Sequence, residues 1–430
     1  MRKPEFDAVM DGLVSADGPG TAVAVRHRGE VVHSAGYGLA NLEWGVPVDT
    51  ETVFRIGSIT KQFTAAAILR LAADGKLGLD DPIERHVPAF PVGDRRISLR
   101  QLLNHTAGVR SLTAMPQFVA IMRNDLPLTG LIALLEDQPP DFAPGERFLY
   151  SNSGYVLLGA VIEAASGRSY EAYLIETFFE PLGLARTSYL HNDPIVRKRA
   201  SGYTLAPTLR NAAPISMTLP HAAGALGSTA EDLLAWELAL RTGRAVSTDA
   251  YSAMTARGQL NDGAPIDYGL GLVNYTYRGH RLVGHGGGIN GFVSNLVHWP
   301  DHDLTIAVAA NSDAFPVQQA TYALARQVLG EPDMVREAMS VSEAVLASCV
   351  GVYEFELGQR LRTKVKDGAL TAHFPRVGSV FRPFGERAFF LASDPEVTFT
   401  FEDLRDGVCQ RLVISGYGEP VTWTRAPAAP

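Results

Sequence analysis

The segment Ser58–Ala73 is apolar on nearly every side when it is drawn as a helix. Its apolar residues are Phe63, Ala65, Ala66, Ala67, Ile68, Leu69, Leu71, Ala72 and Ala73, and Gly75 is placed to end the helix. A helix with apolar side chains all around its axis has no face for water, so other elements have to enclose it. The chain has 430 residues, 46% hydrophobic and 20% charged, which is enough to build an enclosing core. We therefore expect a central helix inside a large domain.

Strand-like segments stand on both sides of this helix in the sequence. Thr21–Arg26 and Val31–Tyr37 predict an N-terminal hairpin. Later apolar or alternating runs predict four more strands and a helix, at Tyr268–Thr276, His280–His285, Phe292–Trp299, Leu304–Ala310 and Val317–Leu329. Helices are predicted between these groups, at Ser98–Asn104, Gly154–Ser166 and Thr229–Leu240, the last with Thr229 and Asp232 in a capping-box pattern. This order predicts one α/β unit with a helix-rich middle over residues 1–335.

The pattern changes after Gly330-Glu331-Pro332. Asp367-Gly368 and Asp406-Gly407 are dipeptides typical of tight hairpins. The strands predicted beside them are Leu361–Lys366, Ala369–Phe374, Val397–Phe401 and Cys409–Ser415. Residues 345–430 are therefore expected to form a separate antiparallel β-barrel, lipocalin-like, or a sandwich. This domain would either stabilise the first one or narrow its pocket, and both interpretations stay open.

Charge and composition exclude several classes of partner. The net charge is −8, and no basic run could neutralise a phosphate backbone, so we expect no nucleic acid. No apolar run approaches the 18 or more residues of a membrane span. Met1–Leu13 is too acidic for a secretory leader, which predicts a cytoplasmic protein, or a periplasmic one if a leader was removed. Cys349 and Cys409 lack metal-ligand spacing, so neither a metal nor a cofactor is expected, and the sequence does not specify an oligomeric state.

Ser58 and Lys61 form an S-x-x-K motif at the start of the apolar helix. Three residues of helix place Lys61 about one turn from Ser58 on nearly the same face. A lysine enclosed by apolar side chains loses hydration, which lowers its pKa and lets it take the serine proton. The alternative is a helix-capping serine followed by a surface lysine.

Tyr150-Ser151-Asn152 stands just before another predicted helix, where side chains of a loop can face a cleft. A phenol beside a cation ionises more readily, so Tyr150 is a candidate base for Ser58. The Asn152 amide could orient both lysine and substrate. The alternative is a packed tyrosine followed by an asparagine cap.

His285-Gly286-Gly287-Gly288 follows a predicted strand, and bare glycines would let a substrate lie along the strand edge. The N–H of Gly288 would then be a second oxyanion donor. Gly286 to Gly291 also fits the dinucleotide pattern G-x-G-x-x-G, but Phe292–Trp299 after it is a predicted strand and not a helix. The remaining alternative is a glycine-rich hairpin in which His285 only packs.

Together the motifs S-x-x-K, Y-x-N and H-x-G, in this order, describe one acyl-transfer site. On these motifs the chain resembles the penicillin-binding-protein and class C β-lactamase superfamily of serine hydrolases over most of residues 10–330, and it is most similar to D-aminopeptidases and related esterases. The phrases that support the resemblance are Leu102-Leu103-Asn104-His105-Thr106-Ala107-Gly108, Pro144-Gly145 before Tyr150-Ser151-Asn152, and Ala223-Gly224-Ala225-Leu226-Gly227-Ser228-Thr229.

The resemblance implies a β-lactamase-like fold, in which an α/β sheet domain packs against an all-α domain with the site between them. It also implies an acyl group on Ser58, proton transfer shared by Lys61 and Tyr150, and an oxyanion hole made by the N–H groups of Ser58 and Gly288. No metal is needed in such a site.

The same resemblance assigns substrate binding to Asn152, His285, Gly286 and Gly287. Most class C β-lactamases have Lys-Thr-Gly where this chain has His285-Gly286-Gly287, so a permanent cation is missing. An ordinary imidazole has a pKa near ~6.5, so we expect His285 to be neutral at neutral pH and cationic below that value. We therefore expect His285 to set the charge preference, with neutral substrates accepted at neutral pH and carboxylate-bearing substrates favoured at lower pH.

The sequence therefore predicts a serine hydrolase that cleaves small esters, amides or D-amino-acid peptides, as a D-aminopeptidase or carboxylesterase does. One alternative is a DD-carboxypeptidase or weak β-lactamase, with β-lactams among its substrates. Another is a penicillin- or peptide-binding sensor with little turnover.

Overall fold

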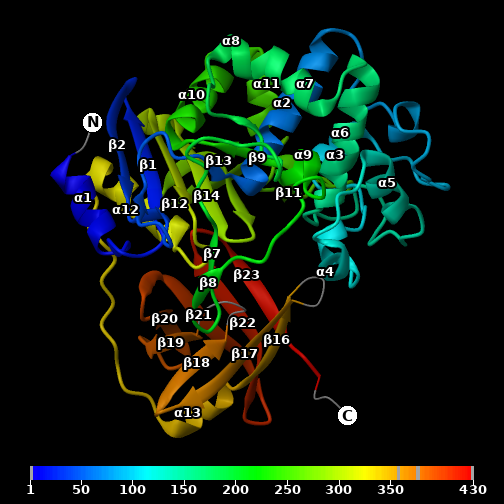
Figure 1. Cartoon of the computed structure of the whole chain (residues 1–430). Helices are drawn as coiled ribbons and strands as arrows, with labels where there is room; N and C mark the ends of the chain where they lie inside the picture. The colour runs from blue at the N-terminus through cyan, green and yellow to red at the C-terminus, as the bar shows by residue number, and fades with distance from the viewer. Residues whose placement is uncertain (1–2, 356–358, 374–377, 428–430) are drawn as a thin grey trace. The chain divides into compact units, whose positions relative to one another are not determined.

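The computed structural model describes residues 3–355, 359–373 and 378–427, which fall into two compact units (Figure 1). The first contains Met1–Thr204, Arg210–Asn274 and His280–Ala325, and the second contains Leu205–Leu209, Tyr275–Gly279 and Arg326–Pro430. The domain limits expected from the sequence, 1–335 and 345–430, stay a prediction. No helix among the described residues is long and apolar enough to cross a membrane.

A six-stranded sheet forms the centre of the first unit, in the order β12-β13-β14-β15-β1-β2. Its strands are β1 (Thr21–His27), β2 (Glu30–Tyr37), β12 (Val273–Tyr277), β13 (His280–Ile289), β14 (Phe292–Trp299) and β15 (Leu304–Ala310). The first and last parts of the chain meet where β1 pairs antiparallel with β15, with Thr21 opposite Ala310. The predicted hairpin and the predicted strands Phe292–Trp299 and Leu304–Ala310 are confirmed.

Helices cover both faces of this sheet because side chains alternate along each strand. On one face of β14, Asn295 bonds to Thr321 and Trp299 packs its ring against Tyr322, both from α12 (Val317–Leu329). On the other face α10 (Ala230–Arg241) packs on β1 and β15, and Leu234 of α10 accepts a hydrogen bond from Arg26.

A group of helices surrounds α2 (Thr60–Ala73), which the short 3₁₀ turn Gly57–Ile59 precedes. The helix is buried nearly along its whole length, as its all-apolar pattern predicts. Phe63 stacks on Trp236 at 3.8 Å between ring centroids. The helices α6 (Asn152–Ser166), α7 (Tyr170–Leu174) and α9 (His221–Gly224) pack against α2, and α3 (Leu99–Leu103) and α5 (Leu128–Glu136) pack against α6.

Capping residues set the ends of these helices. Ser98 and Gln101 form a complete capping box on α3, and α6 ends at Gly167 in the left-handed conformation, with φ of 70°. The box predicted on α10 is only half formed, because the Asp232 carboxylate instead accepts hydrogen bonds from the backbone of Arg186 and the hydroxyl of Thr187.

The predicted strand Tyr268–Thr276 is wrong in its first half. Only β12 (Val273–Tyr277) is a strand, because the chain turns at Gly271, where φ is +77°. A side chain at this position would lie 2.8 Å from the backbone oxygen of Lys61. Tyr268 therefore lies before the strand and is not one of its residues.

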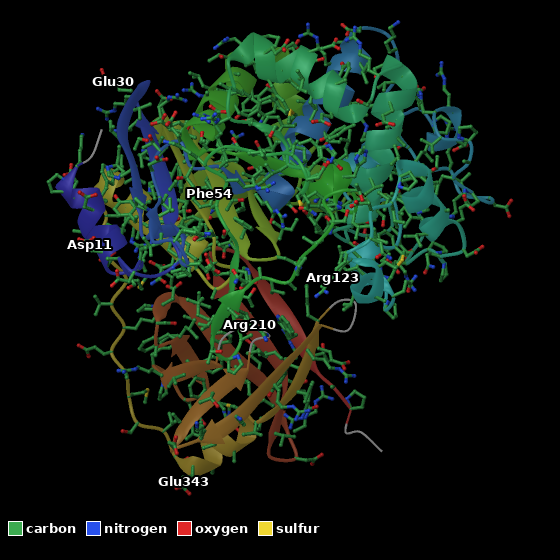
Figure 2. All side chains as sticks on the ribbon, in the orientation of Figure 1. Asp11, Glu30, Phe54, Arg123, Arg210 and Glu343 are labelled. Carbon is green, nitrogen blue, oxygen red and sulfur yellow. The ribbon has the colours of Figure 1, made fainter. Side chains whose placement is uncertain are left out.

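A second, smaller sheet in the first unit joins β5 (Phe54–Arg55) to β9 (Leu226–Ser228) and β9 to β6 (Ser188–Tyr189). Phe54, labelled in Figure 2, is fully buried. Because successive strand residues point to opposite faces, Arg55 points away from that core.

The second unit is a closed antiparallel barrel of eight strands. They are β16 (Gly351–Phe355), β17 (Gln359–Lys366), β18 (Ala369–His373), β19 (Gly378–Pro383), β20 (Ala388–Leu391), β21 (Asp394–Arg405), β22 (Val408–Gly416) and β23 (Gly418–Arg425). Pairing of Tyr353 with Arg425 closes it. Asp367-Gly368 and Asp406-Gly407 make the predicted hairpins, with positive φ at all four residues. The predicted barrel is confirmed, and Phe374 of the expected strand lies outside the described residues.

Candidate active site

Ser58 lies in the 3₁₀ turn that leads into α2, and Lys61 lies in the first turn of α2. The Nζ atom of Lys61 is 3.1 Å from the Oγ atom of Ser58. The i, i+3 spacing of the sequence motif therefore brings the two side chains together, and the alternative of a surface lysine is wrong because Lys61 is fully buried.

Three oxygen atoms surround the Lys61 amine. Besides Ser58, it bonds to Oδ1 of Asn152 and to the backbone oxygen of Ala223, each at 2.8 Å. No carboxylate forms an ion pair with it within the described part of the chain. Burial without a counter-charge lowers the pKa of Lys61 well below its ordinary value. A neutral amine can donate to Asn152 and Ala223 while its lone pair accepts the Ser58 proton.

Asn152 opens α6, and Ser151 caps that helix by accepting a hydrogen bond from Gly154. Asn152 is therefore not the cap. Its amide nitrogen donates to the Thr113 hydroxyl at 3.1 Å, while its oxygen receives the lysine. These two bonds fix the amide so that its oxygen faces Lys61.

Tyr150 lies over the lysine, with its ring centroid 4.7 Å from the Lys61 Nζ atom. Burial raises the pKa of the Tyr150 phenol, and the nearby Ser58 hydroxyl lowers it only in part. The phenol oxygen makes no hydrogen bond of normal geometry within residues 3–355, 359–373 and 378–427. The expected easily ionised phenol is therefore wrong, because the cost of burying a phenolate outweighs the stabilisation that the Ser58 hydroxyl gives it.

The backbone of β13 lies against the 3₁₀ turn beside Ser58. A Cβ atom on Gly57 would lie 2.8 Å from the Gly288 nitrogen, and Gly57 also has φ of +49°, so only glycine fits there without strain. A Cβ atom on Gly287 would lie 1.9 Å from the Ile56 oxygen. These close contacts place the backbone of Gly288 against the 3₁₀ turn that contains Ser58, and Gly286 is exposed on the strand.

His285 is buried behind the strand and does not line the cavity at Ser58. Its Nε2 lies 2.9 Å from the Tyr268 hydroxyl, and its Nδ1 lies 2.6 Å from the backbone oxygen of Gly286. Because that oxygen only accepts, Nδ1 carries the proton and Nε2 accepts from Tyr268. Burial, helped by Lys61, lowers the pKa of His285 to about 3. The expected titration near neutral pH is therefore wrong.

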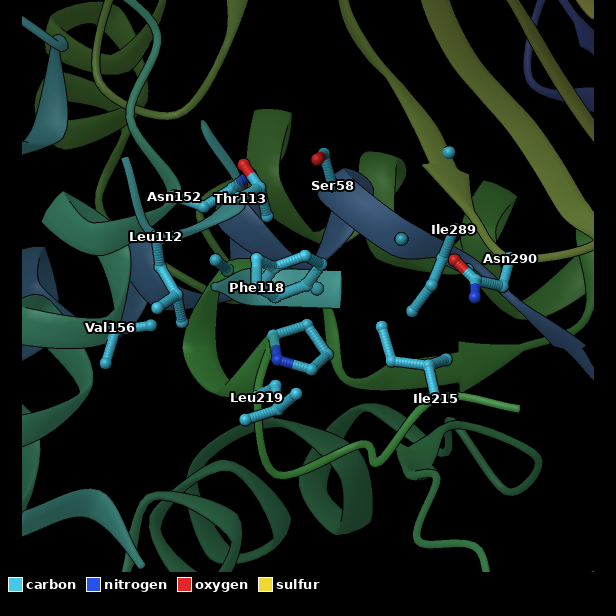
Figure 3. A pocket seen from close by; sticks show the side chains of 15 residues that line it. Ser58, Leu112, Thr113, Phe118, Asn152, Val156, Ile215, Leu219, Ile289 and Asn290 are labelled. Carbon is cyan, nitrogen blue, oxygen red and sulfur yellow. The ribbon is translucent and has the colours of Figure 1, made fainter. Parts of the chain in front are cut away.

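A cavity of about 130 Å³ opens beside Ser58 (Figure 3). Ser58, Asn152, Thr113, Asn290 and the backbone of Gly288 give it a polar side. The rest of its wall is mainly apolar and comes from Leu112, Phe118, Val156, Ile215, Leu219, Pro220 and Ile289. Of the predicted site residues, Ser58, Asn152 and Gly288 line it, whereas Lys61, Tyr150, His285, Gly286 and Gly287 do not.

Sequence reasoning missed three contributors to this site. Tyr268 holds His285, the Ala223 backbone oxygen holds Lys61, and His105 packs its ring 4.3 Å from that of Tyr150. His105 and Ala223 stand in phrases that supported the resemblance, but nothing in their spacing indicates a contact with the motifs.

Comparisons with known proteins identify the family of this chain. The family described as Beta-lactamase matches residues 6–329. The chain belongs to the β-lactamase family. It is thus a member of the penicillin-binding-protein and β-lactamase superfamily of serine hydrolases, and the β-lactamase-like fold that the motifs implied is confirmed.

Individual relatives differ in how much they share with this β-lactamase-family chain. It is 27% identical to Penicillin-binding protein 4* of Bacillus subtilis (strain 168), a match over 89% of this chain and 90% of that protein. It is 30% identical to a D-aminopeptidase of Brucella anthropi, over 68% of this chain but only 56% of the relative. An octameric penicillin-binding protein homologue from Pyrococcus abyssi has a similar structure, with a TM-score of 0.70, 28% identity and coverage of 98% and 99%.

Proposed function

We propose that this chain hydrolyses small esters and amides, including amides and peptides of D-amino acids, through an acyl group carried on Ser58. The observation that carries the proposal is the 3.1 Å contact between the Ser58 hydroxyl and a fully buried lysine amine. Burial lowers the pKa of this lysine, which favours the neutral amine that can take the serine proton, and no metal is needed to activate the serine.

In the proposed acylation step, Ser58 Oγ attacks the carbonyl carbon while its proton passes to Lys61 Nζ. The resulting ammonium keeps its two acceptors, Asn152 Oδ1 and the Ala223 oxygen. The N–H groups of Ser58 and Gly288 receive the oxyanion. Tyr150, which burial keeps protonated, is placed to relay the proton to the leaving group, and water then removes the acyl group by the reverse path.

The cavity supports small, uncharged acyl groups. Its volume of about 130 Å³ is close to that of an engineered apolar cavity of ~150 Å³ that binds benzene, so a phenyl or branched aliphatic group fits. None of the lining side chains is charged. Amide hydrolysis is favoured over β-lactam hydrolysis because His285 stays neutral and offers no cation to an antibiotic carboxylate.

Hydrolysis of neutral p-nitrophenyl esters, D- and L-amino-acid p-nitroanilides and nitrocefin tests this proposal. Turnover of esters or D-anilides by the wild type, lost in Ser58→Ala and kept in the exposed control Ser252→Ala, is the expected result. Faster turnover of nitrocefin would favour the β-lactamase alternative. Acylation of Ser58 without turnover of any compound would favour the penicillin- or peptide-binding sensor.

A further inference from the structure

A second cavity of the first unit, about 280 Å³ in volume, contains two arginines. Arg55 and Arg199 line it together with polar groups that include Asn192, Ser201, Asn211 and Asn290. Neither guanidinium forms an ion pair with a carboxylate in the part of the chain that the structure describes. Within the described residues, the positive charge in this cavity therefore has no carboxylate paired with it.

The positive charges of Arg55 and Arg199 repel each other. Arg55 donates a hydrogen bond of 2.7 Å to Asn192 Oδ1, and its guanidinium carbon lies 5.7 Å from the centre of the Phe292 ring. Arg199 donates to the backbone oxygens of His191 and Asn192. Burial, and then the charge of Arg199, lower the pKa of Arg55 to about 10, so Arg55 remains cationic at neutral pH.

This cavity adjoins the one at Ser58. Asn290 lines both cavities, and Pro214 of the second is followed directly by Ile215 of the first. The Asn192 amide that holds Arg55 also donates to the Ile215 backbone oxygen at 2.8 Å. Arg55 precedes Ser58 by three residues, so their Cα atoms are at most ~11 Å apart. A short substrate can thus reach both places.

From this arrangement we propose that Arg55 and Arg199 form an anion subsite, which binds a carboxylate of a substrate whose scissile carbonyl lies at Ser58. The inference rests on the proposed hydrolase function and adds the class of substrate. A guanidinium fork matches the two oxygens of a carboxylate, and an uncompensated pair favours an anion more than a single exposed arginine does. The preferred substrates would carry an apolar group for the cavity at Ser58 and a carboxylate one or two residues away.

Matched substrates that differ only in charge test the subsite. One pair, D-phenylalanyl-glycine and D-phenylalanyl-glycinamide, places the carboxylate on the leaving group. The other pair, a succinyl ester and its methyl-capped form, places it on the acyl group. The ratio to measure is kcat/KM for the carboxylate-bearing compound divided by kcat/KM for its neutral counterpart. In one of the pairs, Arg55→Gln and Arg199→Gln should each lower this ratio about 10-fold, because each variant loses about one charge-assisted hydrogen bond. Arg55→Lys, which keeps the charge, should lower it less.

The exposed Arg244→Gln serves as the control and should leave the ratio unchanged. Equal losses on acid and neutral substrates in the Arg55 and Arg199 variants would mean that the arginines only anchor the segment around Asn192, and would overturn the subsite. Failure of the wild type to hydrolyse any of these compounds would instead overturn the proposed function. The subsite is then decided in Ser58→Ala by calorimetry: succinate, but not succinamide, should lose affinity on Arg55→Gln, and equal changes for the two compounds would overturn it.

Discussion

Replacing His285 with glutamine should make the first unit less sensitive to acid. His285 is buried with a pKa of about 3, whereas the same side chain in an unfolded chain has a pKa of 6.5. As the pH falls below 6.5, the unfolded state takes up a proton that the folded state refuses, so the free energy of unfolding decreases. Glutamine cannot titrate, so His285→Gln removes this contribution.

The size of the effect follows from the two pKa values. Each pH unit between them changes the free energy of unfolding by ~1.36 kcal/mol. On acidification from about pH 7.5 to pH 5.0, only the interval below pH 6.5 changes the free energy of unfolding. Over that interval His285 should lower the free energy of unfolding of the wild type by ~2 kcal/mol. The hydrogen bond to Tyr268 also changes in the variant, but that change does not depend on pH and cancels when the two pH values are compared.

Urea unfolding of both proteins at the two pH values measures this difference. Trp236 and Trp299 are fully buried in the first unit, so their fluorescence reports its unfolding. The wild type should lose ~2 kcal/mol more than His285→Gln on acidification. Equal losses in the two proteins would refute the burial argument and would mean that the pKa of His285 in the folded protein is close to its ordinary value.

Four further substitutions test individual parts of the site. Lys61→Met and Tyr150→Phe should each lower kcat at least ~10²-fold, and the double variant should be little worse, because both serve one proton path; additive losses would contradict this. Gly57→Ala should destabilise the protein by ~1–3 kcal/mol in thermal unfolding and lower kcat/KM, because its Cβ atom meets the Gly288 nitrogen at a strained φ, and wild-type stability would show that the turn has room. Leu219→Ala should enlarge the apolar cavity, so the preferred chain length of p-nitrophenyl esters should increase, and an unchanged profile would place the acyl group elsewhere.

Local rules of the chain predicted much of this structure. The contact between Ser58 and Lys61 follows from the three-residue spacing on a helix. The burial of α2 follows from its apolar side chains, which surround the helix axis. The Asp-Gly hairpins of the barrel follow from the positive φ that each dipeptide tolerates. These features depend on residues close together in sequence.

What the sequence could not predict depends on contacts between distant segments. The glycines after His285 have no side chains whose alternation would show which face of the strand is buried, so the sequence left a packed His285 as one of two alternatives and did not predict its low pKa. The apolar run from Tyr268 concealed the turn at Gly271, which places the Tyr268 hydroxyl beside His285. Arg55 and Arg199 lie far apart in sequence and meet only in the folded unit.

The central claim is that Ser58 carries the acyl group. Labelling with a fluorophosphonate, followed by intact-mass and peptide mass spectrometry, tests it most directly, because the reagent stays on the activated serine. The wild type should gain one equivalent on the peptide that contains Ser58, Lys61→Met should react far more slowly, and Ser58→Ala should gain none. One equivalent on another serine, or unchanged labelling of Ser58→Ala, would contradict the account.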